Sequence, residues 1–181
     1  FEAAYREGRI KEPALDSYII HDRGVRESGH DTSWRWVVDG KPACADILPV
    51  ELNAALFKYE IDITRIIDVY FAGTVGSHQA ATWRKRARAR KAAIRRYLYD
   101  EAEGLFFDYY VPGKRKHRWL SATVFWPLAA AHADDPSTWL LSGREAHQLA
   151  DAALKQLEQP GGVAGSAPHG FPQIRQWDYP F

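Results

Sequence analysis

The sequence predicts an all-α domain, and three observations lead to this prediction. Apolar residues recur every three to four positions over several long stretches, which is the period of one face of an α-helix. Short segments rich in Gly and Pro separate these stretches. The stretches do not alternate with strands, as they would in an α/β protein. With 181 residues, of which 46% are hydrophobic and 26% charged, the chain is long enough to bury a sizeable core.

Two helices are predicted before residue 30. Residues 1–10 should form the end of a first helix, and Pro13 should break it. The second helix should begin near Asp16, which is an acceptable N-cap, and should end at Gly29, where glycine allows the chain to leave helical geometry. A turn is expected at Asp39–Gly40.

The two longest helices are predicted in the middle of the chain. The first spans about residues 50–70, and its expected apolar stripe is Leu52, Leu56, Tyr59, Ile63, Ile66, Ile67 and Tyr70. The second spans about residues 79–99 and carries a basic run made of Arg84, Lys85, Arg86, Arg88, Arg90, Lys91, Arg95 and Arg96. Such a run can follow a phosphate backbone, but acidic residues come directly after it and the net charge of the whole chain is only +1. An exposed helix face is therefore the favoured interpretation.

Shorter elements are predicted in the last third. Residues 105–111 are aromatic enough for a strand, which should turn at Pro112–Gly113 and pair with residues 114–119 in a small hairpin. Further helices are expected over about residues 121–132 and 143–157. A loop then leads to a second polar, aromatic stretch at the end of the chain.

Several features limit the class of protein. Cys44 is the only cysteine, so a disulfide framework within the chain and a cysteine zinc cluster are both excluded. No apolar run approaches the roughly 20 residues of a membrane span, and no signal peptide is visible. The chain contains no methionine, so we expect its N-terminus to be truncated. On this basis we predict a cytoplasmic protein.

The most unusual segment of the chain is residues 26–36, with the sequence Arg-Glu-Ser-Gly-His-Asp-Thr-Ser-Trp-Arg-Trp. Neither a helical nor a strand period runs through it, so it is hard to interpret as a core element. Aromatic faces can cover a sugar ring, charged groups can bind its hydroxyls, and a carboxylate can act as acid or base. On composition alone, a sugar pocket and a charged loop above two packed tryptophans are equally good interpretations.

Three segments, taken in order, resemble the trehalase family. They are residues 26–36, the Ile-Leu-Pro-Val-Glu-Leu-Asn run at 47–53, and the Arg-Gln-Trp-Asp-Tyr-Pro run at 175–180. Fungal-type neutral trehalases carry a run similar to residues 21–32, and the resemblance covers nearly the whole chain. It implies that the helices are consecutive members of an (α/α)6 toroid of the six-hairpin glycosidase type, with at most a small β-hairpin. Residues 1–181 would then form the central portion of a single, incomplete catalytic domain.

The resemblance also implies an activity, the splitting of trehalose into two glucose molecules with inversion. Inverting glycosidases use a general acid and a general base that stand about 6.5–9.5 Å apart. The family's general acid falls on Asp31, whereas its general base lies downstream of the last residue of this chain. For this role the pKa of Asp31 should be raised by burial and by a negative partner. The substrate-binding residues that the resemblance implies are Arg26, Gly29, Arg35, Trp36, Gln176, Trp177 and Asp178.

No cofactor and no metal site are expected, because the calcium-binding segment of fungal-type relatives would lie outside this chain. The expected partner is trehalose rather than nucleic acid or a membrane, and the oligomeric state stays open. The 181 residues alone should be inactive, and half a toroid should expose apolar faces. Two alternatives remain. One is another (α/α)6 sugar-active enzyme, and the other is a non-enzymatic helical module that binds an anionic partner through Arg84–Arg96.

Overall fold

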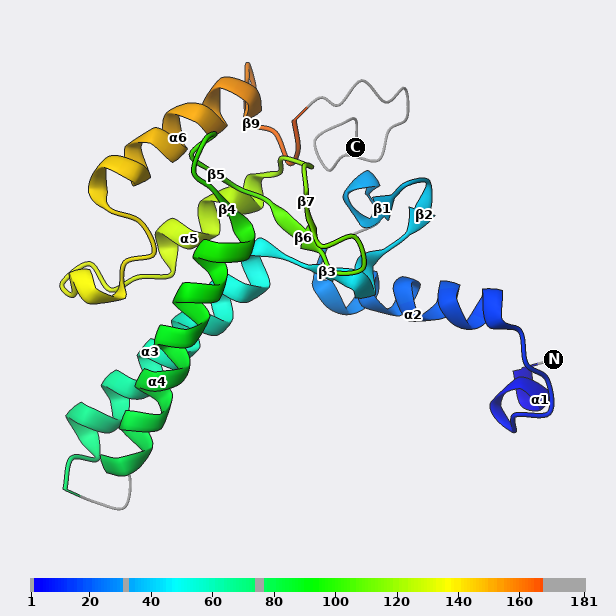
Figure 1. The fold of residues 1–181 in the computed structure, drawn as a ribbon, viewed down its shortest axis with the longest axis horizontal. Coiled ribbons are helices and arrows are strands. Elements are labelled where there is room, and N and C mark those ends of the chain that lie inside the picture. The colour runs from blue at the N-terminus through cyan, green and yellow to red at the C-terminus, as the bar shows by residue number, and fades with distance from the viewer. Residues whose placement is uncertain (1, 31–32, 74–76, 168–181) are drawn as a thin grey trace. The chain divides into compact units, whose positions relative to one another are not determined.

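The computed structural model describes residues 2–30, 33–73 and 77–167, and these fall into two compact units. The first unit contains residues up to 47, and the second begins at residue 48. Helices dominate both units, and the strands are two or three residues long (Figure 1). None of the helices in the described ranges is long and apolar enough to cross a membrane.

The first unit consists of two helices followed by short turns. Its elements are α1 (Glu2–Arg6), α2 (Pro13–Ser28), the 3-10 turn η1 (Trp34–Trp36), the strands β1 (Val37–Val38) and β2 (Lys41–Pro42), and the 3-10 turn η2 (Cys44–Asp46). The expected start of the second helix near Asp16 is wrong, because Pro13 begins the helix. Proline has no N–H to donate and its φ is already helical, so it fits the first helical position. The expected end is confirmed, since Gly29 caps the helix with a φ of 75°.

Helix α2 is held against η2 by close packing and one partly buried hydrogen bond. A Cβ atom at Gly24 would stand 3.3 Å from the Sγ atom of Cys44, so only glycine permits this approach without an adjustment. Three residues earlier, the buried His21 accepts a hydrogen bond at its Nδ1 atom from the Ala45 N–H, at 3.1 Å. The β1–β2 hairpin turns at Asp39–Gly40, as the sequence predicts.

The second unit is built around a pair of long helices, α3 (Val50–Tyr70) and α4 (Ser77–Ala93), which lie side by side (Figure 1). Strand β3 (Ile47–Leu48) leads into α3. The first turn of α3 is stabilised by a residue far along the sequence, since the Val50 N–H donates to the buried carboxylate of Asp108 at 2.9 Å. A negative group is favourable at this position because the N-terminal end of a helix carries partial positive charge. Helix α4 continues through a π-helical turn, η3 (Ile94–Leu98), close to the predicted end.

The predicted boundaries of α3 are correct, but the predicted buried face is wrong. The buried apolar residues are Val50, Ala54, Phe57 and Ile61, whereas Leu52, Tyr59, Ile66 and Tyr70 of the predicted stripe are exposed. Apolar side chains occupy two sides of this helix, and the side with the small Ala54 is the one buried. Small residues allow close approach of two helices, and α4 contributes Ala80 and Ala87 to its own buried side.

Short hairpins, two further helices and two 3-10 turns complete the second unit. The strands pair as β4 (Tyr99–Asp100) with β5 (Leu105–Phe106), β6 (Asp108–Tyr110) with β7 (Arg115–His117), and β8 (Glu158–Gln159) with β9 (Gly162–Val163). Between them lie the 3-10 turn η4 (Ala122–Phe125), the short helix α5 (Trp126–Ala129), the 3-10 turn η5 (Pro136–Thr138) and α6 (Gly143–Leu157).

The helix expected over residues 121–132 is reduced to η4 and α5. Pro127 has no N–H to donate to the carbonyl of Thr123, so a continuous α-helical ladder cannot run through it. Helix α6 has the predicted bounds and begins with a complete capping box between Ser142 and Glu145. The core of this unit joins α3, α6 and the hairpins, and its largest fully buried apolar side chains are Phe57, Phe106, Leu105, Leu149, Leu157 and Val124.

Candidate functional site

The segment predicted to carry the active site begins where α2 ends. The side chain of Ser28 donates to the carbonyl of Val25 at 2.7 Å and accepts from the N–H of His30 at 3.0 Å. Together with the left-handed conformation of Gly29, these bonds end the helix and turn the chain away from its axis. Asp31, the predicted general acid, lies outside the described residues.

Arg26 lies in the last turn of α2 and is exposed. Its guanidinium donates to the carboxylate of Asp22, with Nε–Oδ2 at 2.8 Å and Nη2–Oδ1 at 3.3 Å. The hydrogen bond and the charge of Asp22 raise the pKa of Arg26, so this group is a permanent cation. Because a guanidinium has five N–H donors and Asp22 uses two of them, the side chain retains donors that face solvent.

Arg35 and Trp36 lie in η1, beyond the predicted acid, and both are only 3% exposed. The Arg35 guanidinium lies 4.5 Å from the centre of the Trp36 ring, and the His30 ring lies 6.4 Å from the same ring. A cation over a tryptophan face is the most favourable form of cation–π contact. These three side chains therefore hold together the two described ends of the segment, on either side of residue 31.

The structure thus brings four predicted site residues, Arg26, Gly29, Arg35 and Trp36, into one segment of the first unit. The other predicted residues, Gln176, Trp177 and Asp178, lie outside the described residues, as Asp31 does. Glu51 and Asn53, from the run at 47–53 that resembles the family, lie at the start of α3, where the Asn53 amide donates to the carbonyl of Pro49 at 2.9 Å.

Sequence reasoning assigned no role to His21, although this residue fixes the helix that positions the segment. Its Nδ1 atom binds the Ala45 N–H, and its Nε2 atom lies 3.8 Å from a carboxylate oxygen of Asp46. The signal available in the sequence was a histidine on the side of α2 that also carries Gly24. That pattern is too common to identify an anchor without the fold.

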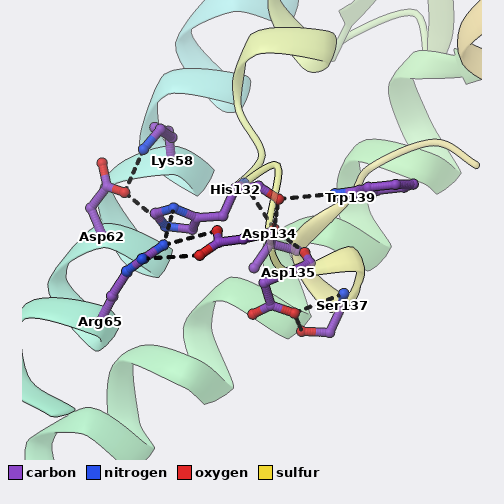
Figure 2. Close-up of polar contacts among 9 residues, drawn as sticks. Lys58, Asp62, Arg65, His132, Asp134, Asp135, Ser137 and Trp139 are labelled. Carbon is purple, nitrogen blue, oxygen red and sulfur yellow. Dashed lines mark hydrogen bonds and ion pairs between the residues drawn. The ribbon is translucent and has the colours of Figure 1, made fainter. Parts of the chain in front are cut away.

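The second unit contains a polar cluster that sequence reasoning did not predict (Figure 2). The guanidinium of Arg65 binds both carboxylate oxygens of Asp134 at 3.0 and 3.1 Å, and its Nη1 atom lies 3.2 Å from Nδ1 of His132. The Nε2 atom of His132 lies 3.0 Å from Asp62, which also pairs with Lys58. The hydrogen bond from Arg65 holds the pKa of Asp134 below its usual range. The cluster borders a cavity of about 470 Å³ between α3, α4 and the loop after α5.

This cluster joins residues about seventy positions apart, so no local sequence pattern could have indicated it. Its charges also pair with one another, which is the arrangement of a structural clamp between α3 and the loop after α5. In the described ranges, no group of three or more His, Cys, Asp or Glu side chains is placed to hold a metal ion. The expectation of a chain without metal or cofactor stays a prediction.

The described residues are mostly helical, as the all-α prediction requires, and the fold is part of an (α/α)6 toroid, the architecture that the family resemblance implies. The solved structure titled neutral trehalase Nth1 from Saccharomyces cerevisiae superimposes with a TM-score of 0.82 at 37% sequence identity, and covers 99% of this chain and 33% of that chain. The family model described as Trehalase matches residues 1–181. The chain belongs to the trehalase family.

Curated relatives match along the whole chain. A cytosolic neutral trehalase of Pyricularia oryzae is 40% identical over 201 residues, which include 100% of this chain and 26% of the relative. The cytosolic neutral trehalase of Saccharomyces cerevisiae is 37% identical over 193 residues, which include 100% of this chain and 24% of the relative. The chain therefore spans about a quarter of the length of these relatives. The resemblance on which the sequence analysis relied is confirmed.

Proposed function

We propose that this chain is the central portion of the catalytic domain of an α,α-trehalase, which hydrolyses trehalose to two glucose molecules with inversion. The observation that carries the proposal is membership of the trehalase family along the entire chain, including the polar segment that follows α2. The proposed substrate is trehalose, without a cofactor. The relatives are named cytosolic neutral trehalases, and we propose the same compartment for this protein.

In the proposed mechanism Asp31 is the general acid. It gives its proton to the oxygen between the two sugars, while a water activated by a base attacks the anomeric carbon from the opposite face. The base is not among the residues of this chain assigned to the site, so the proposal needs residues outside it. Gly29 contributes by ending α2 two residues before the acid in the sequence.

The remaining roles follow from the chemistry of the side chains. Arg26 would donate its solvent-facing N–H groups to sugar hydroxyls, with Asp22 holding it in place. Arg35 and Trp36 would support the acid's loop, since their stacked side chains are buried. We propose that Gln176, Trp177 and Asp178 bind the sugar as well, with the indole against its apolar face and the polar groups on its hydroxyls.

The alternative of a helical module that binds a polyanion through Arg84–Arg96 has less support. Arg84 pairs with Asp68, Arg90 with Glu60, and Arg95 with Glu145. These contacts take up three cations of the run within the second unit itself. Another sugar-active enzyme of the same toroid architecture differs from a trehalase only in its substrate, so assays on several disaccharides distinguish them.

The test compares the full-length protein with its Asp31→Asn variant on trehalose, maltose and sucrose. We expect glucose release from trehalose alone, and a fall in kcat of about 10²–10⁴-fold in the variant, because general acid catalysis typically contributes that much. Asp39→Asn, at the β1–β2 turn, is the matched control and should keep full activity. Circular dichroism should show the same fold in all three proteins.

The stereochemistry supplies a second readout. Inversion releases one glucose as the β-anomer and the other as the α-anomer, because only one anomeric bond is broken. Proton NMR during the first turnovers should therefore show both anomers in equal amounts. Release of the α-anomer alone would contradict inversion, and full activity in Asp31→Asn would remove Asp31 from the mechanism.

A further inference from the structure

A strongly basic groove lies on the second unit, away from the segment after α2 in sequence. It has a volume of about 510 Å³, and its walls come from η3, β6, β7 and the residues next to β7. The lining residues are Arg96, Tyr97, Tyr109, Lys114, Arg115, Lys116 and Arg118. Five of these seven are cations and none is a carboxylate, which distinguishes this groove from an ordinary mixed-charge surface.

Some of these cations have partners just outside the groove. Arg118 binds Asp100 at 2.7 Å and also pairs with Glu103, while Nζ of Lys116 lies 4.0 Å from Asp100. By contrast, Arg96 and Lys114 are exposed and form no ion pair with any residue that the structure describes. Two cations of the groove therefore have no carboxylate partner in the described part of the chain.

Aromatic rings hold the cations in position. The Arg96 guanidinium lies 5.2 Å from the centre of the Tyr97 ring, and the Arg115 guanidinium lies 5.8 Å from that of Tyr110. Tyr97 in turn packs edge-to-face on Tyr109, with ring centres 5.1 Å apart. A guanidinium stacked on a ring keeps its N–H groups at its edge, so it can still donate to an anion with little loss of entropy.

The cavity beside the clamp of Figure 2 differs from the basic groove, because charges of both signs line it. Four cations line it, but so do the carboxylates of Asp68, Asp134 and Asp135. Arg65 binds Asp134 (Figure 2), and Arg84 binds Asp68. An anion that entered there would compete with three carboxylates for the cations, although Arg88 and Lys91 form no ion pair among the described residues. No such competition exists at Arg96 and Lys114.

We propose that the basic groove binds a small molecule that carries a phosphate group. The phosphate oxygens would meet Arg96 and Lys114, because a guanidinium fork matches the geometry of phosphate and a lysine supplies a point charge. Tyr97 and Tyr109 would line the organic part. A volume of about 510 Å³ suits one small ligand rather than a length of polynucleotide. The proposal does not depend on trehalase activity, since it uses none of the residues assigned to that site.

The experiment is isothermal titration calorimetry on the full-length protein with inorganic phosphate, glucose 6-phosphate and glucose. We expect saturable binding of both phosphates, none of glucose, and a tighter complex with the sugar phosphate if the tyrosines contribute. Combining Arg96→Ala with Lys114→Ala should weaken binding about tenfold or more, since charge-assisted hydrogen bonds are lost. Arg86→Ala is the control for each of the two substitutions made singly, because it removes one positive charge from α4 at an exposed position outside the groove.

Three results would overturn the proposal. They are the absence of saturable binding by either phosphate, binding that the double variant leaves unchanged, and equal weakening in Arg86→Ala. If a single-stranded oligonucleotide bound through Arg96 and Lys114 while both small phosphates failed to bind, the groove would be a polyanion surface and the proposal would be wrong. Should the double variant misfold, Lys114→Ala alone, at an exposed turn, gives the same comparison.

Discussion

Replacing Arg90 by alanine tests whether the basic run of α4 is structural. The guanidinium of Arg90 binds both carboxylate oxygens of Glu60 at 3.0 Å and reaches the amide oxygen of Asn53 at 3.3 Å. The Glu60 side chain is 8% exposed and that of Arg90 is 28% exposed. The substitution therefore leaves a nearly buried carboxylate on α3 without its cation.

The expected loss of stability in Arg90→Ala follows from the burial of the Glu60 carboxylate. Breaking a fully buried ion pair from one side costs about 3–5 kcal/mol. Because water reaches part of the Arg90 side chain, we expect a smaller loss of about 2–3 kcal/mol, within the cost of an unsatisfied buried charged group. A loss of about 2 kcal/mol corresponds to a factor of roughly 30 in an opening equilibrium.

Amide hydrogen exchange of α3 and α4, read by mass spectrometry on the full-length protein, measures this loss locally. We expect exchange to accelerate in Arg90→Ala and to be nearly unchanged in Arg88→Ala, since Arg88 is exposed and has no ion-pair partner among the described residues. Adding Glu60→Gln to Arg90→Ala should restore part of the protection by removing the buried charge. Equal exchange in Arg88→Ala and Arg90→Ala would refute the reasoning.

Two further predictions concern stability in the second unit. Burial alone would raise the pKa of Asp100, but hydrogen bonds from the Glu103 N–H and from Arg118 outweigh it and hold this pKa below 3.8. The resulting stability is present above the pKa of the unfolded chain and is lost as the pH falls through the folded value. The melting temperature of Asp100→Asn should thus lie below that of the wild type at pH 7, with the difference shrinking below about pH 4, and a pH-independent difference would contradict this. Ser142→Ala removes the capping box of α6 and should cost about 1 kcal/mol in urea unfolding, whereas a cost of zero would mean that the cap is dispensable.

Local signals account for the elements that were predicted well. The bounds of α3 and α6 agree with the expectation, because Pro49 and the Ser142–Glu145 capping box mark their starts and helical periodicity marks their lengths. The end of α2 at Gly29 is likewise local, since a single left-handed residue terminates the helix. By contrast, the prediction of one helix over residues 121–132 is wrong. Apolar periodicity carries no information about the N–H group that Pro127 lacks.

In the candidate site, too, some features follow from local sequence and others from tertiary packing. The resemblance of residues 26–36 to the trehalase family predicts a sugar-binding segment, which composition alone does not distinguish from a charged loop. Its position after a helix is confirmed, whereas the binding of a sugar stays a prediction. The internal arrangement of this segment was not predictable, because the burial of Arg35 and Trp36 and the anchoring of α2 by His21 depend on how separate turns pack together. The arrangement around residues 31 and 176–178 stays a prediction.

The sequence by itself determined the family, the helical class and the ends of the main helices, since all of these depend on neighbours along the chain. Only the tertiary structure decided which side of α3 is buried, because two apolar sides exist and packing against α4 selects the one with Ala54. The tertiary structure also decided which arginines form ion pairs with carboxylates. Arg90 meets Glu60 from thirty residues away, while Arg96 meets no carboxylate in the described part of the chain, and charge pairing over such separations depends on three-dimensional proximity alone.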